Sequence, residues 1–106
     1  MIIVTLQLKA TPEKRWDVLK AIHALIGPIS VQTGCLHCAF YSNTRNDDEM
    51  ILLEKWETYK DLERHIRTDE FRKIIATMEA VSLPPEINFY ETDSIKGMDL
   101  VEEILS

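Results

Sequence analysis

Residues 54–71 read EKWETYKDLERHIRTDEF, and in this stretch a strand gives way to a helix. The residues before it are rich in Ile and Leu, which favours a strand that ends near Trp56. Thr58 is a residue type that caps helices, and Leu62 and Ile66 follow it at helical spacing. The stretch therefore predicts the end of a buried strand, followed by a capped helix.

Two elements are predicted at the start of the chain. Apolar and polar residues alternate through Ile2–Lys9, which predicts a strand, and Thr11-Pro12-Glu13 is a typical helix start. Pro28 cannot donate to the carbonyl of Ala24, so the helix either stops there or kinks and continues to Gly34. We expect the kink, with Gly34 in the left-handed conformation that follows a helix end.

The remaining elements follow from apolar patterning and turn residues. Cys35–Asn43 and Glu49–Glu57 are predicted strands joined by a polar loop at 44–48. Thr68 or Asp69 begins a further helix, which Pro84-Pro85 ends. A fourth strand is predicted at Glu86–Thr92 and a short helix at Met98–Leu105.

The predicted order is β-α-β-β-α-β, with a domain at 1–94 and a tail at 95–106. This order is typical of an α+β, ferredoxin-like fold, an antiparallel sheet with two helices on one face. Strand 35–43 alternates Leu36, Cys38 and Phe40 with Ala39 and Tyr41, so both of its faces are apolar or aromatic. Helices cover only one face, so we expect a second copy of the chain to cover the other in a homodimer.

Composition narrows the choice of partner and compartment. The chain has 106 residues, a formal net charge of −6 and no basic run, which argues against a nucleic-acid partner. No segment reaches the roughly 18 apolar residues that would span a bilayer. The N-terminus reads as a strand rather than as a leader peptide, so we expect a cytoplasmic protein without a membrane partner.

The sequence resembles the antibiotic biosynthesis monooxygenase domain. The likeness covers residues 1 to about 93 and is carried by Thr11-Pro12-Glu13-Lys14, Gly34-Cys35 and, above all, Glu54-Lys55-Trp56-Glu57. Leu62, His65, Thr68 and Phe71 complete the pattern. The resemblance implies a dimeric α/β barrel, with a pocket between the helices and the sheet of each subunit.

The resemblance also implies a chemistry. Members with a known reaction oxidise phenols or hydroquinones with molecular oxygen and use neither metal nor flavin, since the deprotonated substrate supplies the electrons. Such a reaction needs a dry pocket, a base and a wall for the ring. By this likeness Trp56 would wall the substrate and His65 would handle its proton. Expected cofactors and metal ligands are therefore none.

Each candidate also has a structural interpretation. Trp56 could simply fill the space between sheet and helix, and His65 could cap its helix. Glu54 shares a strand face with Trp56 and could be the base, but pairing with Arg64 or Arg67 is the simpler expectation. Further candidate pocket residues, whose orientation the sequence leaves open, are Tyr59, Tyr41, Asn43 and Tyr90.

Two other chemistries are disfavoured. Relatives that cleave haem carry a histidine where this chain has Ile75 and an asparagine in the region of Thr5, Leu6 and Gln7. Cys35 and Cys38 are three residues apart, so on a regular strand their thiols point to opposite faces and cannot share one metal ion without a bulge. We interpret them as core cysteines.

The function that the sequence favours is thus a cofactor-independent monooxygenase acting on small phenolic or quinol compounds. A homodimeric module that binds a small hydrophobic ligand without catalysis is an alternative. An isomerase of a small metabolite is another, and a phosphorylated substrate would require cations such as Lys55, Arg64 and Arg67 to converge on the pocket.

Overall fold

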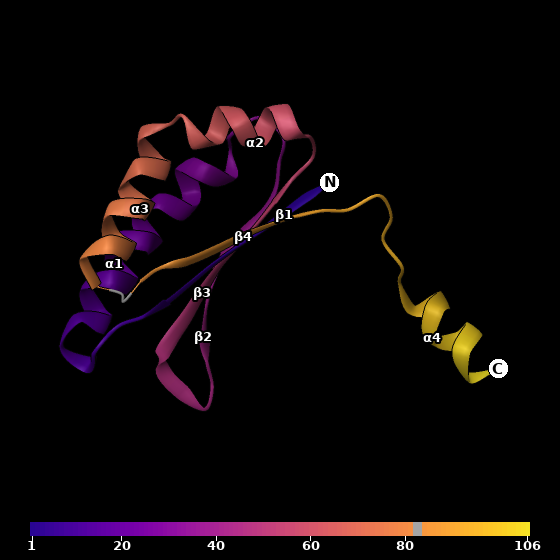
Figure 1. Ribbon diagram of the computed structural model, residues 1–106, viewed down its shortest axis with the longest axis horizontal. Coiled ribbons are helices and arrows are strands. Elements are labelled where there is room, and N and C mark those ends of the chain that lie inside the picture. Colours follow the sequence, from indigo (N-terminus) through magenta and orange to yellow (C-terminus); the bar gives the residue numbers. More distant parts are fainter. Residues whose placement is uncertain (82–83) are drawn as a thin grey trace.

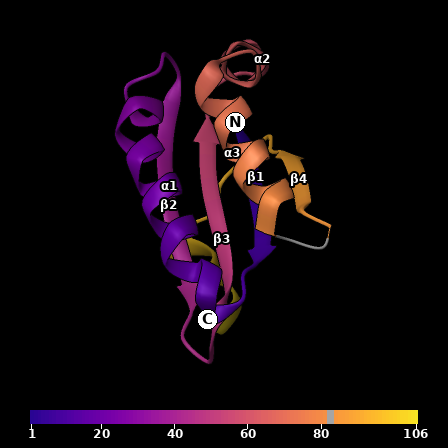
Figure 2. The same cartoon turned by 90° about the vertical axis from the view of Figure 1, so that its left-hand side faces the viewer.

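A computed structural model describes residues 1–81 and 84–106 of the chain. Three helices lie on one face of a four-stranded antiparallel sheet with strand order β2-β3-β1-β4, and the C-terminal helix stands apart (Figures 1 and 2). This is the ferredoxin-like α+β fold that the sequence predicts. The elements are β1 (Ile2–Lys9), α1 (Pro12–Ser30), β2 (Cys35–Asn43), β3 (Asn46–Trp56), α2 (Tyr59–Ile66), α3 (Asp69–Val81), β4 (Glu86–Glu91) and α4 (Met98–Leu105).

The core lies between the helices and the inner face of the sheet. Every second residue of β1, from Ile2 to Leu8, is buried there, and Leu6 lies opposite Leu52 of β3. Helix α1 contributes Ile22 and Ile29 to the same cluster, and α3 contributes Ile74. The alternation in the sequence therefore identifies the buried face of the sheet correctly, because side chains on a strand alternate between its faces.

The end of α1 differs from its prediction. The helix includes Pro28, as expected, but it ends at Ser30 and does not continue to Gly34. Ile29 is fully buried, and its burial accounts for the continuation of the helix past a proline that removes one hydrogen bond. Gly34 has a φ of 80°, which confirms its predicted left-handed conformation within the loop that leads to β2.

The β2–β3 hairpin is tighter than predicted. β3 begins at Asn46 rather than Glu49, and Asn43 lies opposite Asn46, so only Thr44 and Arg45 connect the strands. Asn43 Oδ1 accepts a hydrogen bond from the Arg45 N–H at 2.9 Å, which stabilises this turn. β3 also ends at Trp56, one residue earlier than predicted.

The two threonines after β3 define the next helices. Thr58 Oγ1 accepts from the Asp61 N–H at 3.2 Å, and this confirms it as the cap of α2. Thr68 Oγ1 donates to the His65 carbonyl at 2.7 Å and accepts from the Phe71 N–H, so it links the end of α2 to the start of α3. The predicted helix at Met98–Leu105 is present as α4.

The last strand, β4, is one residue shorter than predicted at its C-terminal end. β4 ends at Glu91 rather than Thr92, although the Thr92 N–H still donates to the Met1 carbonyl at 2.9 Å. Within residues 1–81 and 84–106, none of the helices combines the length and the apolar character needed for a membrane crossing.

Candidate active site

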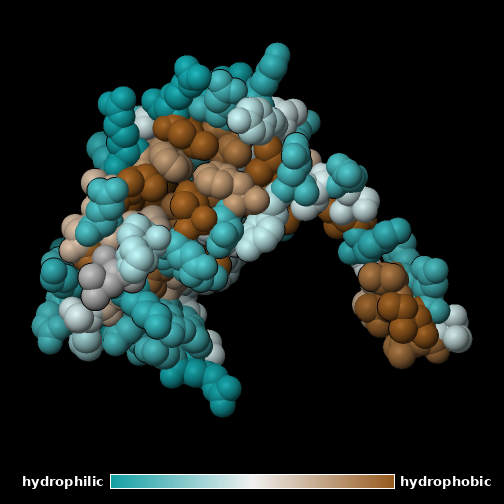
Figure 3. All heavy atoms as spheres, viewed as in Figure 1, coloured by the Kyte–Doolittle hydropathy of each residue, from teal (hydrophilic) through white to brown (hydrophobic). Residues whose placement is uncertain are grey.

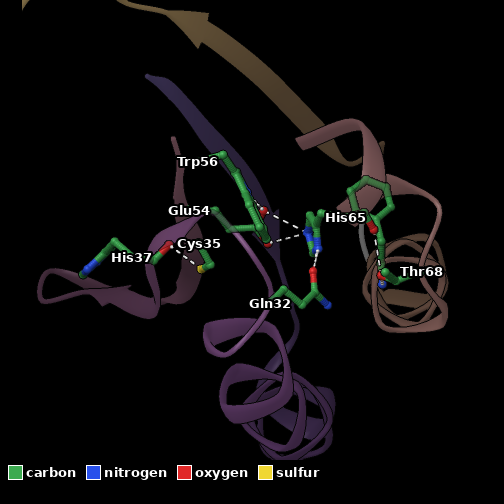
Figure 4. A network of polar contacts seen from close by, with 8 residues as sticks. Gln32, Cys35, His37, Glu54, Trp56, His65 and Thr68 are labelled. Atoms are coloured by element: carbon green, nitrogen blue, oxygen red, sulfur yellow. Dashed lines mark hydrogen bonds and ion pairs between the residues drawn. The ribbon is translucent and has the colours of Figure 1, made fainter. Parts of the chain in front are cut away.

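A carboxylate and an imidazole form a buried pair between the sheet and α2. Glu54 is fully buried and His65 is 1% exposed, and His65 Nε2 lies 3.1 Å from Glu54 Oε1 (Figure 4). The indole N–H of Trp56 donates to the same carboxylate at 3.0 Å. Glu54 therefore accepts hydrogen bonds from two neighbours in a dry environment, which offsets part of the cost of burying its charge.

The second nitrogen of the histidine is also occupied. His65 Nδ1 lies 2.8 Å from Gln32 Oε1, the amide oxygen of a residue in the loop between α1 and β2. Both ring nitrogens thus lie within hydrogen-bond distance of side-chain oxygens, so each is engaged within the protein. In this arrangement neither nitrogen is free to accept a proton from a ligand.

Aromatic rings enclose the imidazole. The Trp56 ring stacks on it with centroids 4.3 Å apart, and the Phe71 ring meets it edge-on at 5.3 Å. Trp56 itself is fully buried. The predicted meeting of Trp56, His65 and Glu54 is therefore present, but these side chains have no contact with solvent through which a ligand could reach them directly.

Local sequence explains how these residues converge. Glu54 and Trp56 are two apart on β3, so both face the helices, and Leu62 and His65 form the buried side of α2. Gly34 positions the loop that carries Gln32, because a side chain at Gly34 would collide with the Asp61 side chain at the start of α2. Close packing of this loop on α2 thus places the Gln32 amide beside the imidazole.

The expected arginine partners of Glu54 are instead engaged elsewhere. Arg64 binds Asp61 at 3.1 Å and Arg67 binds Glu63 at 2.9 Å, and these pairs lie on the exposed side of α2. The prediction that Glu54 pairs with Arg64 or Arg67 was therefore wrong. The reason is helical geometry, since residues three or four apart on a helix are neighbours and reach each other more easily than they reach a strand.

The two cysteines lie on the same face of β2, which the regular-strand prediction did not expect. The pairing with β3 skips Leu36, so Cys35 lies opposite Trp56 and Cys38 lies opposite Glu54. This bulge leaves Leu36 54% exposed, contrary to its predicted place beside Cys38 and Phe40. The cysteines still pack against the core, as predicted.

Burial and the nearby carboxylate keep both thiols protonated. Burial raises the pKa of Cys38 to about 12, and the negative charge of Glu54 adds to this effect. Burial also raises the pKa of Cys35. Reactive and metal-binding cysteines need the opposite shift, because the thiolate is the nucleophile and the ligand. Among the described residues, no group of three or more His, Cys, Asp or Glu side chains is placed to hold a metal ion.

An apolar hollow lies next to this buried pair, on the other side of α2. We call it the α2 hollow, and it has a volume of about 320 Å³. Its lining residues are Ile2, Tyr59, Leu62, Ile66, Phe89 and Glu91. Ile2 lies opposite Trp56 in the sheet and Ile66 directly follows His65, so the hollow and the buried pair share a wall. Tyr59 is thus the only one of the predicted pocket residues that lines it within the described chain.

The other predicted pocket residues lie elsewhere. Asn43 lines a larger hollow of about 770 Å³ at the hairpin end of the sheet, together with Gln7, Lys9 and Glu86. Tyr41 lies on the open face of the sheet, where its hydroxyl is 3.1 Å from His37 Nε2. Tyr90 is 51% exposed on the same face. Neither hollow is lined by Lys55, Arg64 or Arg67, so the cations that an isomerase of phosphorylated substrates would need do not converge at either.

Two residues near the site, Gln32 and Glu91, were not predicted from the sequence. Gln32 lies in a loop and carries no pattern that connects it to His65, 33 positions away. Glu91 ends β4, and its place in the α2 hollow follows from the pairing of β4 with β1, where it lies opposite Ile2. The strand order, which puts β1 between β3 and β4, is the signal that could have found Glu91.

A sequence comparison finds a relative of most of this chain. The chain is 24% identical over 91 residues to the uncharacterised protein sll1783 of Synechocystis sp., covering 85% of this chain and 62% of that protein. It therefore spans less than two thirds of that relative's length.

Solved structures share the fold. A conserved protein of Methanosarcina mazei is 27% identical with a TM-score of 0.80, covering 87% of this chain and 92% of that one. A candidate antibiotic biosynthesis monooxygenase of Deinococcus radiodurans is 15% identical with a TM-score of 0.84, covering 92% and 97%. Rv0793 of Mycobacterium tuberculosis is 16% identical with a TM-score of 0.81, covering 91% and 98%.

The family description "Antibiotic biosynthesis monooxygenase" matches residues 1–77, from the first strand through most of α3. The match includes Glu54, Trp56 and His65, the residues whose spacing carries the resemblance in the sequence. With more than half of the chain matched and the same fold in the solved relatives, this protein belongs to the antibiotic biosynthesis monooxygenase family.

Proposed function

We propose that the protein oxidises a small phenol or quinol with molecular oxygen, and that the substrate binds in the α2 hollow. The observation that carries this proposal is the hollow itself, which is mostly apolar and lies beside the Trp56–His65–Glu54 cluster. A volume of about 320 Å³ is at the lower end of ligand pockets and accommodates one or two fused aromatic rings.

Two polar groups at the hollow can handle the substrate hydroxyl. Tyr59 is 64% exposed and offers a phenolic hydroxyl, while Glu91 offers a carboxylate that accepts a proton or a hydrogen bond. The remaining lining residues are apolar and offer a surface on which the ring can pack. In this proposal Tyr59 orients the hydroxyl and Glu91 serves as the base.

The buried cluster acts in this scheme by positioning. His65 and Glu54 hold α2 against β3, and Leu62 and Ile66 of the same helix line the hollow. Direct contact of Trp56 or His65 with the substrate stays a prediction from the family resemblance. It would require α2 to move away from the sheet, because both side chains are enclosed at present.

The reaction balances without a bound cofactor. Loss of the phenolic proton gives an electron-rich anion, which transfers electrons to oxygen and forms a peroxide at a ring carbon. Cleavage of the O–O bond leaves one oxygen atom on the ring as the new quinone carbonyl. The other oxygen atom leaves as water with the proton and the hydrogen that the ring has lost.

Oxygen consumption by the purified protein tests the proposal. A panel of naphthols and naphthohydroquinones is compared with the autoxidation of each compound alone, and saturable uptake above that background is expected. Ile66→Trp places an indole in the α2 hollow and should abolish the uptake. Ala76→Trp places the same side chain at an exposed position of α3 and should leave it unchanged. Uptake at the autoxidation rate for every compound would refute the proposed oxidation.

A binding module without catalysis is the second candidate, and one observation favours it. Both nitrogens of His65 are already hydrogen-bonded, so the residue expected to move the proton is fully engaged. A module of this kind should bind the same aromatic compounds saturably and consume no oxygen. The Ile66→Trp variant should no longer bind them. Binding is measured by calorimetric titration on the samples used for oxygen uptake.

We also propose that two copies pair through the open faces of their sheets. Support comes from the side chains on this face, which include the half-buried Ile3, Ile51 and Leu53 and the exposed Tyr41 and Tyr90. The Thr5 hydroxyl in the middle of the face has no hydrogen-bond partner among the described residues. A second sheet would remove this apolar surface from water.

A further inference from the structure

Helix α4 is amphipathic but has no core of its own to pack on. None of its residues is buried, and Met98, Ile104 and Leu105 are each at least 66% exposed. Leu100 and Val101 belong to the same side of the helix, by its 3.6-residue repeat. Figure 3 shows an apolar patch on this helix. An apolar stripe of this kind is favourable only when something covers it.

The chain holds α4 away from its own domain. After the Thr92 N–H donates to Met1, the segment 93–97 extends beyond the edge of the sheet, and α4 follows it (Figure 1). α4 thereby stands on the open side of the sheet, opposite α1, α2 and α3. The family match ends at residue 77, so α4 lies outside the matched residues.

The chain therefore carries two uncovered apolar surfaces on one side, the open face of the sheet and the apolar stripe of α4. These surfaces do not meet within one copy. In a dimer with a two-fold axis, the sheet face and the α4 stripe of one copy can both pack on the second copy. The same two surfaces of the second copy then pack on the first.

A membrane is a poorer occupant. Interfacial helices are typically rich in Lys and Arg on their polar side, whereas the polar side of α4 carries Asp99, Glu102 and Glu103. The chain as a whole has a formal charge of −6, which opposes contact with anionic lipid. The helix is also only 8 residues long.

We infer that α4 is an exchanged clamp, which packs its apolar stripe on a second copy of this chain and holds together the dimer formed by the open sheet faces. This inference rests on the proposed dimer and adds to it a segment outside the family match. The clamp makes dimerisation depend on residues of the tail as well as on the sheet.

Two matched variants of the full chain test the clamp. Val101→Gln with Ile104→Gln makes the apolar stripe polar, and Asp99→Gln with Glu103→Gln changes the opposite side of the same helix. Gln is a good helix former in both, so α4 itself is retained. Analytical ultracentrifugation should show the dimer dissociation constant rising at least about tenfold for the first variant, and changing less than about threefold for the second.

Cross-linking locates the helix. Equal amounts of light and heavy-isotope chains are mixed, unfolded and refolded together, and Lys96, next to α4, is linked to lysines of the main domain. Links that join a light chain to a heavy chain support the clamp. Links confined to single chains, or an unchanged dissociation constant in the apolar-stripe variant, would overturn it while the sheet dimer stands. A wild-type chain that is monomeric at all concentrations would overturn both.

Discussion

The two sides of α2 differ in how completely their polar groups are paired. On the side facing β3, His65 is enclosed by Glu54, Gln32 and two aromatic rings. On the side facing β1 and β4, Tyr59 and Ile66 border a hollow and remain partly exposed. Groups that satisfy one another hold a fold together, whereas exposed groups around a concave apolar surface are available to a ligand.

The residues that carry the family resemblance are therefore not the residues that a ligand can reach. The Glu54–Trp56–His65 pattern carries the family likeness, and it belongs to the side of α2 that is closed. The residues that border the hollow include Tyr59 and Glu91, which are exposed. The closed side therefore predicts large effects on stability and the open side small ones, and substitutions on both sides test this.

Removing one member of the buried pair should have the largest effect. In His65→Leu the Glu54 carboxylate stays buried and loses the partner at 3.1 Å, so we expect a loss of about 3–5 kcal/mol in unfolding free energy. Urea denaturation monitored by circular dichroism measures it. Glu54→Leu with His65→Leu removes both partners and should be more stable than His65→Leu. Costs that simply add in the double variant would contradict a coupled pair.

Gly34 offers the next largest effect. Gly34→Ala forces a side chain into the left-handed region and against Asp61, and a loss of about 1–3 kcal/mol is expected. Gly27→Ala is the matched control, because it lies within α1 and a Cβ there would meet no described atom within 4 Å apart from its chain neighbours and the backbone of its own helix. The unfolding free energy of that variant should change by less than about 1 kcal/mol, because the better helix propensity of Ala is opposed by contact of its Cβ with Pro28. Equal effects of the two substitutions on the midpoint of thermal unfolding would contradict the constraint that the left-handed conformation and the contact with Asp61 place on Gly34.

The raised pKa of Cys38 predicts that the folded protein loses stability at alkaline pH. Its pKa is about 12 in the folded protein, whereas a cysteine in an unfolded chain titrates near ~8.5. The folded state thus holds the proton more tightly, so this contribution is complete below pH ~8.5 and declines as the pH rises towards 12. About 2 kcal/mol should be lost by pH ~10. Denaturation across this range should show a shallower decline in Cys38→Ala, and parallel curves would contradict the shift.

The open side of α2 should show the smallest change in stability. Tyr59→Phe removes an exposed hydroxyl, so its unfolding free energy should change by less than about 0.5 kcal/mol. Affinity for a phenolic ligand should fall about threefold to tenfold, as expected for one lost hydrogen bond. Tyr90→Phe, outside the α2 hollow, is the control and should leave affinity unchanged. Equal affinities of the Tyr59 variant and the wild type would exclude that hydroxyl from the site.

Much of the fold was predictable because the signals are local. Alternation identified β1 to the residue, Thr58 identified the start of α2, and the apolar pattern at Met98–Leu105 identified α4. Two boundaries were misplaced by more than one residue. α1 ends at Ser30 rather than at Gly34, before the loop from which Gln32 contacts His65, and β3 starts early because Asn43 closes a tight turn with Arg45.

Spacing along the chain was enough to predict the family, the order of the elements and the placement of Glu54 and Trp56 on one strand face. The folded structure was needed to show that Glu54 pairs with His65 rather than with an arginine, that Gln32 binds the second nitrogen of His65, and that a hollow opens beside them. Such contacts join residues far apart in the chain, and side-chain packing and the competition among possible partners determine which of them form.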